Sequence, residues 1–256
     1  MTTITVLGSG TSSGIPIIGC PCAVCASANP KNKRLRSSCF IQTNEKNILI
    51  DTSPDLRQQA LTQGIRKIDA VLYTHDHADH VHGIDDLRPF NIITGKPIPA
   101  YGHPSLMSRL VKKFPYIFDD GNDYPSFVPQ LKAIPVEGDF DCVDIPVRMI
   151  PCQHGPHMTH NYRIGDMAWL TDTNGIPPES VERLKGLKVL FVDGLRLKPH
   201  PTHFHLEETL KAAAKIGAER TYLIHLSHDY DHDEFNRTLP PGIELAYDGL
   251  RVGILD

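Results

Sequence analysis

Four histidines and three aspartates crowd into one short segment, residues 75–85, which reads HDHADHVHGID and is separated from the apolar run AVLY only by Thr74. On an extended chain, residues i and i+2 point the same way, so His75 and His77 can share one metal ion. A turn after them would carry Asp79 and His80 to a neighbouring position. Imidazole and carboxylate groups suit Zn²⁺, and also Mn²⁺ or Fe. The segment therefore predicts a metal centre at the end of a strand.

A second group of metal-binding residue types lies near the start of the chain, where Cys20, Cys22 and Cys25 fall within six residues. Three thiolates are one ligand short of the tetrahedral set that a structural zinc needs. His228 is the candidate for the fourth ligand. Such crowding favours metal binding over a disulfide framework in a protein of reducing compartments. Of the other cysteines, Cys39 and Cys142 are expected to pack in the core, and Cys152 fits no metal-binding pattern.

Composition limits the partners and the compartment. The 256 residues are 40% hydrophobic and 22% charged, as in ordinary soluble proteins. No apolar run approaches the roughly 18 residues that span a bilayer, so we expect no membrane partner. The start, MTTITVLGSG, lacks the basic and apolar regions of a secretory signal, and the expected location is cytoplasmic. A net charge of −4 argues against long nucleic acids but is compatible with a small phosphorylated substrate.

These residues must be positioned by a mixture of strands and helices. Period-two and buried apolar runs predict strands over 4–8, 39–43, 47–51, 69–74, 143–150, 161–165, 167–171, 188–193 and 220–226. Helical periodicity covers 55–63, 178–185 and 206–216. A second half begins near residue 131, after an irregular surface excursion over 115–130. This order predicts an α/β protein with two mixed sheets between helical layers. No composition shift divides the chain, so 1–256 is expected to form a single domain with a zinc-binding loop at 20–25.

The pattern H-x-H-x-D-H at residues 75–80 resembles the signature of the metallo-β-lactamase superfamily. The loop C-x-C-x-x-C, together with the pair His225 and His228, resembles the PhnP subgroup of cyclic phosphodiesterases and shares features with the pyrroloquinoline quinone biosynthesis protein B. The resemblance implies an αββα four-layer sandwich with a binuclear centre between the edges of its sheets. It also implies that His75 and His77 join a third histidine on one ion, while Asp79 and His80 bind the other.

The remaining ligands implied by the resemblance follow later strands. They are His154 after 143–150, Asp172 after the strand that ends in MAWL, and His225 after TYLI, with Asp172 bridging both ions. His157 and His160 are the rivals of His154. The resemblance thus implies two catalytic divalent ions, zinc or manganese or iron, and one structural zinc.

A catalytic histidine is implied in the segment PHPTHFH, residues 199–205. His203 is the candidate general acid, with His200 and His205 as alternatives. Asp79 would orient the attacking nucleophile and accept its proton. Arg196 and Lys198 are candidates for positive charge near the leaving group, and the loop Gly8–Gly14 for phosphate contacts through its N–H groups and hydroxyls.

Together these features predict a metal-dependent phosphodiesterase that hydrolyses small, including cyclic, phosphodiesters through a hydroxide bridging two ions. The alternatives are a tRNA-processing phosphodiesterase, a hydrolase of the thioesterase or lactamase type, and a non-hydrolytic cofactor-biosynthesis protein. The acidic chain lacks a basic RNA-gripping arm, and all seven ligand positions are filled, which favours a hydrolase of small substrates. The expected partner is a small phosphodiester, and the resemblance suggests a homodimer.

Overall fold

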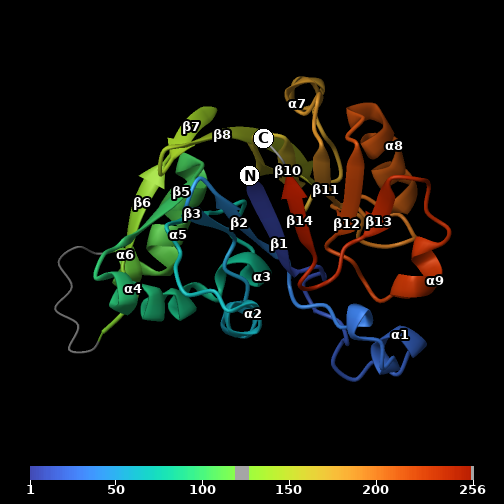
Figure 1. The fold of residues 1–256 in the computed structure, drawn as a ribbon, viewed down its shortest axis with the longest axis horizontal. Coiled ribbons are helices and arrows are strands. Elements are labelled where there is room, and N and C mark those ends of the chain that lie inside the picture. The colour runs from blue at the N-terminus through green and yellow to red at the C-terminus, as the bar shows by residue number, and fades with distance from the viewer. Residues whose placement is uncertain (119–126, 255–256) are drawn as a thin grey trace.

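The structure is a computed structural model that describes residues 1–118 and 127–254. Two seven-stranded sheets face each other, and helices cover their outer faces (Figure 1). The first sheet has the order β14 (Arg251–Ile254), β1 (Thr2–Gly8), β2 (Ser38–Thr43), β3 (Lys46–Ile50), β4 (Ala70–Leu72), β5 (Ile98–Gly102) and β6 (Leu131–Pro135). The second has the order β13 (Ile243–Leu245), β12 (Arg220–Ile224), β11 (Val189–Asp193), β10 (Met167–Leu170), β9 (His157–Ile164), β8 (Ile145–His154) and β7 (Asp139–Cys142).

The helices divide between the two sheets. On the side of the first sheet lie α2 (Leu56–Gln63), α3 (Ala78–Val81), α4 (Arg88–Thr94), α5 (Pro104–Lys113), α6 (Pro115–Phe118) and the 3₁₀ helix η2 (Ile84–Leu87). On the side of the second lie α7 (Pro178–Arg183), α8 (Leu206–Ile216) and α9 (His232–Asn236). The cysteine loop and α1 (Ala23–Ala26) protrude near α9, close to the 3₁₀ helix η1 (Pro30–Asn32). The predicted αββα sandwich is confirmed.

Strands in both sheets are buried on both faces, which explains their continuous apolar sequences. In β3, Ile48 and Ile50 face the core between the sheets, whereas Leu49 faces the helices of the first sheet. In β11, Phe191 faces the inter-sheet core and packs 5.3 Å from Trp169, measured between ring centroids. Three connected cores, one between the sheets and one under each helical layer, therefore hold the four layers together.

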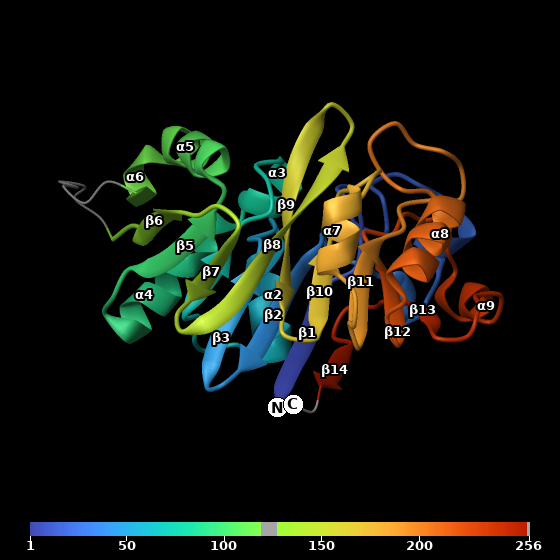
Figure 2. The same cartoon turned by 90° about the horizontal axis from the view of Figure 1, so that it is seen from above.

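The parallel strand pairs bring several strand ends to one edge. Strands β3 and β4 are parallel, as are β10, β11 and β12, and the β8–β9 hairpin extends along the same edge (Figure 2). In open α/β sheets, the crevice outside the carboxyl ends of the strands is the usual place for a site. Strands β1 and β14 pair at the opposite side, where Thr2 lies opposite Ile254 (Figure 2).

The predicted start of a second half near residue 131 is wrong. Strand β6, over Leu131–Pro135, pairs in parallel with β5 and completes the first sheet, and β14 also returns to that sheet. The sequence pattern of a strand does not record which neighbour it pairs with, so this assignment needed the tertiary structure. Part of the predicted excursion, residues 119–126, lies outside the described residues, and α6 begins it. Among the described residues, no helix combines the length and apolar character needed to cross a bilayer.

The surroundings of Gly83, which lies in the histidine-rich segment 75–85, show how tightly this edge is packed. A Cβ atom there would lie 1.9 Å from the backbone oxygen of Ser53, and the Gly83 N–H donates to Thr52 O at 2.9 Å. We expect Gly83→Ala to lower the free energy of unfolding in urea by about 2–3 kcal/mol, because neither backbone segment can yield cheaply. Gly253→Ala is the control, since its Cβ would meet only the Met1 side chain at 3.7 Å. Equal effects of the two substitutions would contradict this packing.

Candidate metal centres

The seven predicted ligands of the binuclear centre lie together at the shared strand edge. They form two groups, in each of which one ligand atom per residue lies within 4.8 Å of the others. The first group is His75, His77, His154 and Asp172, and the second is Asp79, His80, Asp172 and His225. Most of these side chains are buried, but His77 is exposed and opens the first group to solvent. The arrangement can hold two ions that a solvent molecule or substrate could reach.

Asp172 belongs to both groups and lies between them. Its Oδ1 is 3.7 Å from His75 Nε2, whereas its Oδ2 is 3.0 Å from His80 Nε2 and 3.4 Å from His225 Nδ1. The two carboxylate oxygens thus face different groups. This is the geometry that a bridging ligand requires, and it matches the bridging role implied for Asp172.

Three buried ring nitrogens in these groups have no hydrogen-bond partner. They are His75 Nε2, His80 Nε2 and His225 Nδ1. An unpaired buried polar atom costs about 1–3 kcal/mol, so native proteins rarely leave several side by side. All three lie at ion-pair distance from the carboxylate of Asp172, 3.0–3.7 Å, without a hydrogen bond to it. The donor types and these orphaned atoms therefore fit divalent metal ions.

The electrostatics of the centre favour added positive charge. Burial lowers the pKa of His75 well below its usual range, so its imidazole is neutral, as metal binding requires. Burial opposes the charge on Asp172, but the surrounding imidazoles of His225 and His80 hold the pKa of that carboxyl well below normal. His80 has a raised pKa despite its burial, because Asp172 and Asp79 face it. The ionised carboxylates would attract a cation into this cavity.

Three aspartate and histidine residues at the strand ends adopt a left-handed backbone. The φ angles are 60° at Asp51, 51° at Asp172 and 58° at His225. Such angles are uncommon for residues other than glycine, and they cluster at functional sites. Asp51 directly follows β3, and His225 directly follows β12. Asp172 is the second residue after β10. The sharp turn ends the strand and directs the side chain into the centre.

Asp51 is a supporting residue that sequence reasoning missed. Its Oδ2 accepts a hydrogen bond from His80 Nδ1 at 2.7 Å, and it also accepts from Thr74 N at 2.8 Å and Thr74 Oγ1 at 2.7 Å. A carboxylate on the far nitrogen fixes the orientation of a ligating histidine. His154 is oriented similarly, because its Nδ1 donates to Thr202 O at 2.8 Å. The available signal was an aspartate at the end of an apolar strand, the same signal that marked Asp172.

The segment that carries His75 and His77 is fixed by its backbone. Tyr162 Oη donates to Tyr73 O at 2.6 Å, and His160 N donates to Thr74 O at 3.0 Å, so β9 of the second sheet holds the end of β4 of the first. On the outside, α5 contributes Lys113, whose Nζ donates to Asp76 O at 2.8 Å. The ligand-bearing turn is therefore held from both sheets and from a helix.

Of the candidate general acids, His203 lies beside the centre. Its Nε2 is 3.8 Å from Asp172 Oδ1, and its ring stacks on His225 with centroids 4.9 Å apart. His205 instead caps α8, where its Nδ1 lies 2.6 Å from Glu208 Oε2. His200 lies further out, with its ring centroid 5.1 Å from that of His203. The structure thus brings His203 to the centre and leaves His200 at its rim.

Asp193, at the end of β11, was also missed by sequence reasoning. Its Oδ2 lies 2.6 Å from His203 Nδ1, and the pair is buried. Burial alone would lower the pKa of His203, but the ion pair with Asp193 raises it to about 9. His203 is therefore protonated at neutral pH, with Nε2 as the donor that faces Asp172.

The rivals of His154 lie outside both groups. His157 is exposed at the tip of the β8–β9 hairpin. His160 stacks on His103, with ring centroids 4.1 Å apart and an interplanar angle of 1°. Burial lowers the pKa of His160 to about 4, which keeps its ring neutral. His154 alone of the three belongs to a metal-binding group among the described residues.

The cysteine group also forms as predicted from the sequence. His228 Nδ1 lies 3.3 Å from Cys20 Sγ, 3.5 Å from Cys22 Sγ and 3.6 Å from Cys25 Sγ. These separations suit four atoms around one tetrahedral ion. The Cys25 N–H donates to Cys22 Sγ and lowers the pKa of that thiol to about 7, whereas burial raises the pKa of Cys25 to about 11. A metal that displaces the protons would relieve this mixture of charged and neutral thiols.

Arg34, which follows η1, connects the N-terminal part of the chain to the segment after β12. Its guanidinium is buried and donates to Ser227 O at 3.2 Å and Tyr230 O at 2.8 Å, on either side of His228. The other cysteines pack in the apolar cores, which confirms the expectation for Cys39 and Cys142.

The N-terminal loop does not act as a set of free N–H groups. The N–H groups of Ser9, Gly10, Thr11 and Gly14 donate to acceptors within the protein. The loop instead places Thr11 Oγ1 3.3 Å from His225 Nε2. The prediction that the loop binds phosphate through its N–H groups is therefore wrong for these four positions, because each N–H group already donates to an oxygen of the protein.

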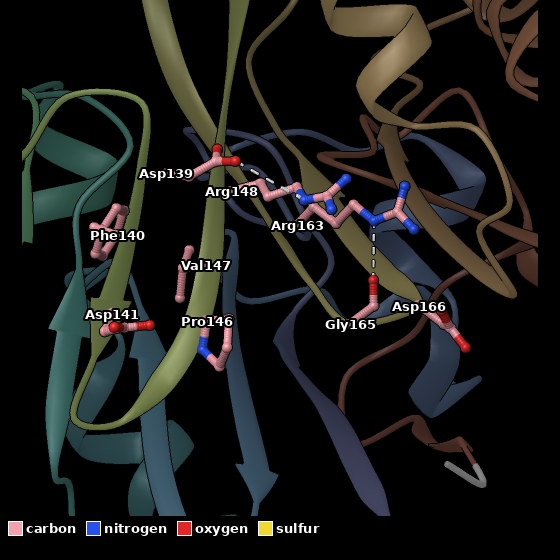
Figure 3. A pocket seen from close by; sticks show the side chains of 9 residues that line it. All are labelled: Asp139, Phe140, Asp141, Pro146, Val147, Arg148, Arg163, Gly165 and Asp166. Atoms are coloured by element: carbon pink, nitrogen blue, oxygen red, sulfur yellow. Dashed lines mark hydrogen bonds and ion pairs between the residues drawn. The ribbon is translucent and has the colours of Figure 1, made fainter.

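A hollow of about 580 Å³ lies beside β7, β8 and β9 (Figure 3). Its lining has both charges, and the close-up shows Arg148 directed toward Asp139 and Arg163 donating to Gly165 O. None of its nine lining residues belongs to the metal-binding groups. Arg148 pairs with Asp139, Arg163 is engaged by main-chain oxygens, and we assign the hollow no chemistry.

Comparisons with known proteins agree with this geometry. Residues 46–226 match the family described as a beta-lactamase superfamily domain. A crystal structure described as a new diphosphatase from the PhnP family is 45% identical, with a TM-score of 0.92 over 100% of this chain and 98% of that one. The structure of Zn²⁺-bound PqqB from Methylobacterium extorquens shares the fold, with a TM-score of 0.80 and 20% identity over 98% of this chain and 100% of that one.

A longer relative also matches by sequence. An octanoyltransferase from Porphyromonas gingivalis is 43% identical over 250 residues, which are 96% of this chain and 50% of that protein. The chain thus spans about half the length of this relative.

The cysteine group can be tested by metal analysis. We expect Cys22→Ser to remove about one equivalent of zinc per chain and to lower the melting temperature, because three remaining ligands no longer complete a tetrahedral site. The matched control is Cys142→Ser, a thiol buried between the sheets, which should keep the full metal content. Unchanged zinc in Cys22→Ser, measured by elemental analysis of purified protein, would show that this group holds no metal.

Proposed function

Because the chain belongs to the metallo-β-lactamase superfamily, as its motif predicted, we propose that it hydrolyses small phosphoric diesters at the centre around Asp172. The proposal includes cyclic diesters and diphosphates substituted at both ends, whose phosphorus atoms also have two bridging oxygens. The observation that carries it is the likeness, at 45% identity over essentially the whole chain, to a diphosphatase of the PhnP family.

The two metal-binding groups would hold a pair of divalent ions, which supply Lewis acidity and lower the pKa of bound water. Around them, the side chains of this chain divide the proton transfers. Burial disfavours the charge on Asp79, but His80 beside it holds the pKa of the carboxyl well below its usual range. An ionised Asp79 can accept the proton of the attacking water.

The leaving oxygen needs a proton, because a free alkoxide is far too basic to depart at neutral pH. His203 is buried, protonated and oriented by Asp193, so its Nε2 is the donor that we assign to this step. The two carboxylates of Asp79 and Asp193 thus have opposite roles: the first takes a proton, and the second keeps one on His203. The exposed ring of His77 marks the side from which substrate enters.

A panel of substrates tests the proposal. We expect the metal-loaded protein to hydrolyse bis(4-nitrophenyl) phosphate, a cyclic nucleotide or a dinucleoside diphosphate with a higher kcat/KM than an octanoyl thioester or a β-lactam. The thioester is included because the P. gingivalis relative is named for octanoyl transfer. Faster turnover of the thioester or lactam would overturn the assignment, since the centre would then act on carbonyl carbon.

His203→Ala should distinguish substrates by their leaving group. We expect kcat to fall by about 10²–10⁴ for an alkyl diester, and far less for a 4-nitrophenyl diester, whose leaving group needs no proton. In the wild type, the rate should decline as the pH rises through about 9, where His203 loses its proton. Asp193→Asn should move this decline to lower pH, because Asp193 raises that pKa.

The control for this prediction is His157→Ala, an exposed histidine of the neighbouring hairpin. It should leave both the leaving-group dependence and the pH profile unchanged. Equal losses of His203→Ala on both diesters would exclude His203 as the acid.

A further inference from the structure

One amide side chain, that of Asn174, bonds to two segments that both lead to residues of the centre. Its Oδ1 accepts the N–H of Gly155 at 2.9 Å, and its Nδ2 donates to Pro201 O at 2.9 Å. Gly155 directly follows the predicted ligand His154, and Pro201 lies two residues before His203. A single side chain thus joins the end of a ligand-bearing strand to the segment that leads to the candidate acid.

The backbone that carries this amide is itself held against β8. Asn174 is the second residue after Asp172, and its N–H donates to Gln153 O at 2.9 Å. In return, Gln153 N donates to Gly175 O at 2.7 Å, so a short bridge joins the segment after β10 to the end of β8. The amide therefore starts from a backbone whose place relative to Asp172 is already set.

The segment that leads to the candidate acid needs donors from elsewhere. It has two prolines, Pro199 and Pro201, which have no N–H group to donate. Its carbonyl groups can still be held. Asn174 donates to Pro201 O, and His154 Nδ1 donates to Thr202 O at 2.8 Å. The last two carbonyls before the acid are thus each held by a side chain from the segments that carry metal ligands.

The two segments also pack directly against each other. A Cβ atom at Gly155, where φ is 60°, would lie 2.7 Å from Thr202 Cγ2. The rings of His154 and His203 are 4.7 Å apart, measured between centroids. A shift of residues 201 and 202 would therefore move His203 relative to both His154 and Asp172.

The two contacts of Asn174 require an amide. Its oxygen faces an N–H donor and its nitrogen faces a carbonyl acceptor, and an amide side chain supplies one group of each kind. A carboxylate can only accept, and an apolar side chain can do neither. The residue type at this position thus follows from the two segments that it joins.

We propose that Asn174 is a positioning residue for the proton transfer to the leaving group. It holds the backbone before His203 in place relative to His154 and Asp172. Asp193 orients the imidazole ring, whereas Asn174 sets where the backbone that carries the ring lies. The inference rests on the proposed function and adds to it the residue that determines the distance between acid and centre.

Asn174→Asp separates the two contacts, because a carboxylate still accepts the Gly155 N–H but repels Pro201 O. The segment before His203 should shift, while the end of β8 stays in place. We expect kcat for an alkyl diester to fall by about tenfold with KM within about twofold, since a small misplacement of a catalytic group is enough for such a loss. A 4-nitrophenyl diester, whose leaving group needs no proton, should keep its kcat within about twofold.

The matched control is Asn236→Asp, the same substitution at the outer edge of the second sheet. Asn236 Oδ1 accepts the Leu245 N–H at 2.7 Å, and its Nδ2 lies 3.1 Å from His232 Nε2, so this amide also bridges two segments. The control should keep the leaving-group dependence of the wild type. Asn174→Ala, which adds no charge, should show the same difference between the two diesters as Asn174→Asp.

Two further measurements isolate the positioning role. Hydrogen exchange of residues 199–203, followed by mass spectrometry, should become faster in Asn174→Asp and not in Asn236→Asp. When Asn174→Asp is combined with His203→Ala, the alkyl diester should be hydrolysed no more slowly than by His203→Ala alone, because the acid is already absent. A further loss in the double variant would overturn the inference.

The outcomes separate the two proposals. Equal losses on the two diesters would show that Asn174 only supports the fold, and unchanged rates on both would show that its bond to Pro201 does not position the acid. Either result overturns this inference while the diesterase activity stands. A wild type that hydrolyses neither diester would overturn the proposed function, and the role assigned to Asn174 fails with it.

Discussion

The buried carboxylate of Asp172 is the constraint on which the rest of the centre depends. It is 2% exposed, and a buried charge is costly unless opposite charges or metal ions surround it. His75 from the turn after β4, His80 from α3 and His225 from the end of β12 lie within 3.0–3.7 Å of it. None of these imidazoles forms a hydrogen bond on the nitrogen that faces Asp172. The carboxylate and the imidazoles attract one another, and the nitrogens without a hydrogen bond are also free to bind ions.

This convergence requires the two sheets to be held in register, because His75 and His80 follow a strand of the first sheet whereas Asp172 and His225 follow strands of the second. The inter-sheet core supplies the general attraction. The specific alignment comes from hydrogen bonds beside the centre, in which Tyr162 and His160 of β9 donate to the carbonyls at the end of β4. The hydrogen bonds that align the two sheets therefore lie beside the metal-binding side chains.

The segment after β12 supplies a ligand to the group around Asp172 and a ligand to the cysteine group, within four residues. His225 belongs to the binuclear centre, and His228 belongs to the cysteine group. Arg34 fixes the carbonyls on either side of His228, and Thr11 lies against His225, so the N-terminal loops hold this segment from outside. The cysteine group is thereby tied to the group around Asp172, although its three cysteines are far in sequence from His225.

The sequence by itself determined the local chemistry. The segment 75–80 and the cysteine loop have motif spacings, and the alternation of strands and helices predicted the layered fold. Only the tertiary structure revealed Asp51 and Asp193, because an aspartate after an apolar strand is common, and its partner is set by which strands are neighbours. The same reason explains why a second half was predicted to begin near residue 131, and why His200 and His205 remained alternatives to His203. Spacing along the chain records what one segment can bind, whereas strand pairing and the left-handed turns at Asp51, Asp172 and His225 decide which side chains meet.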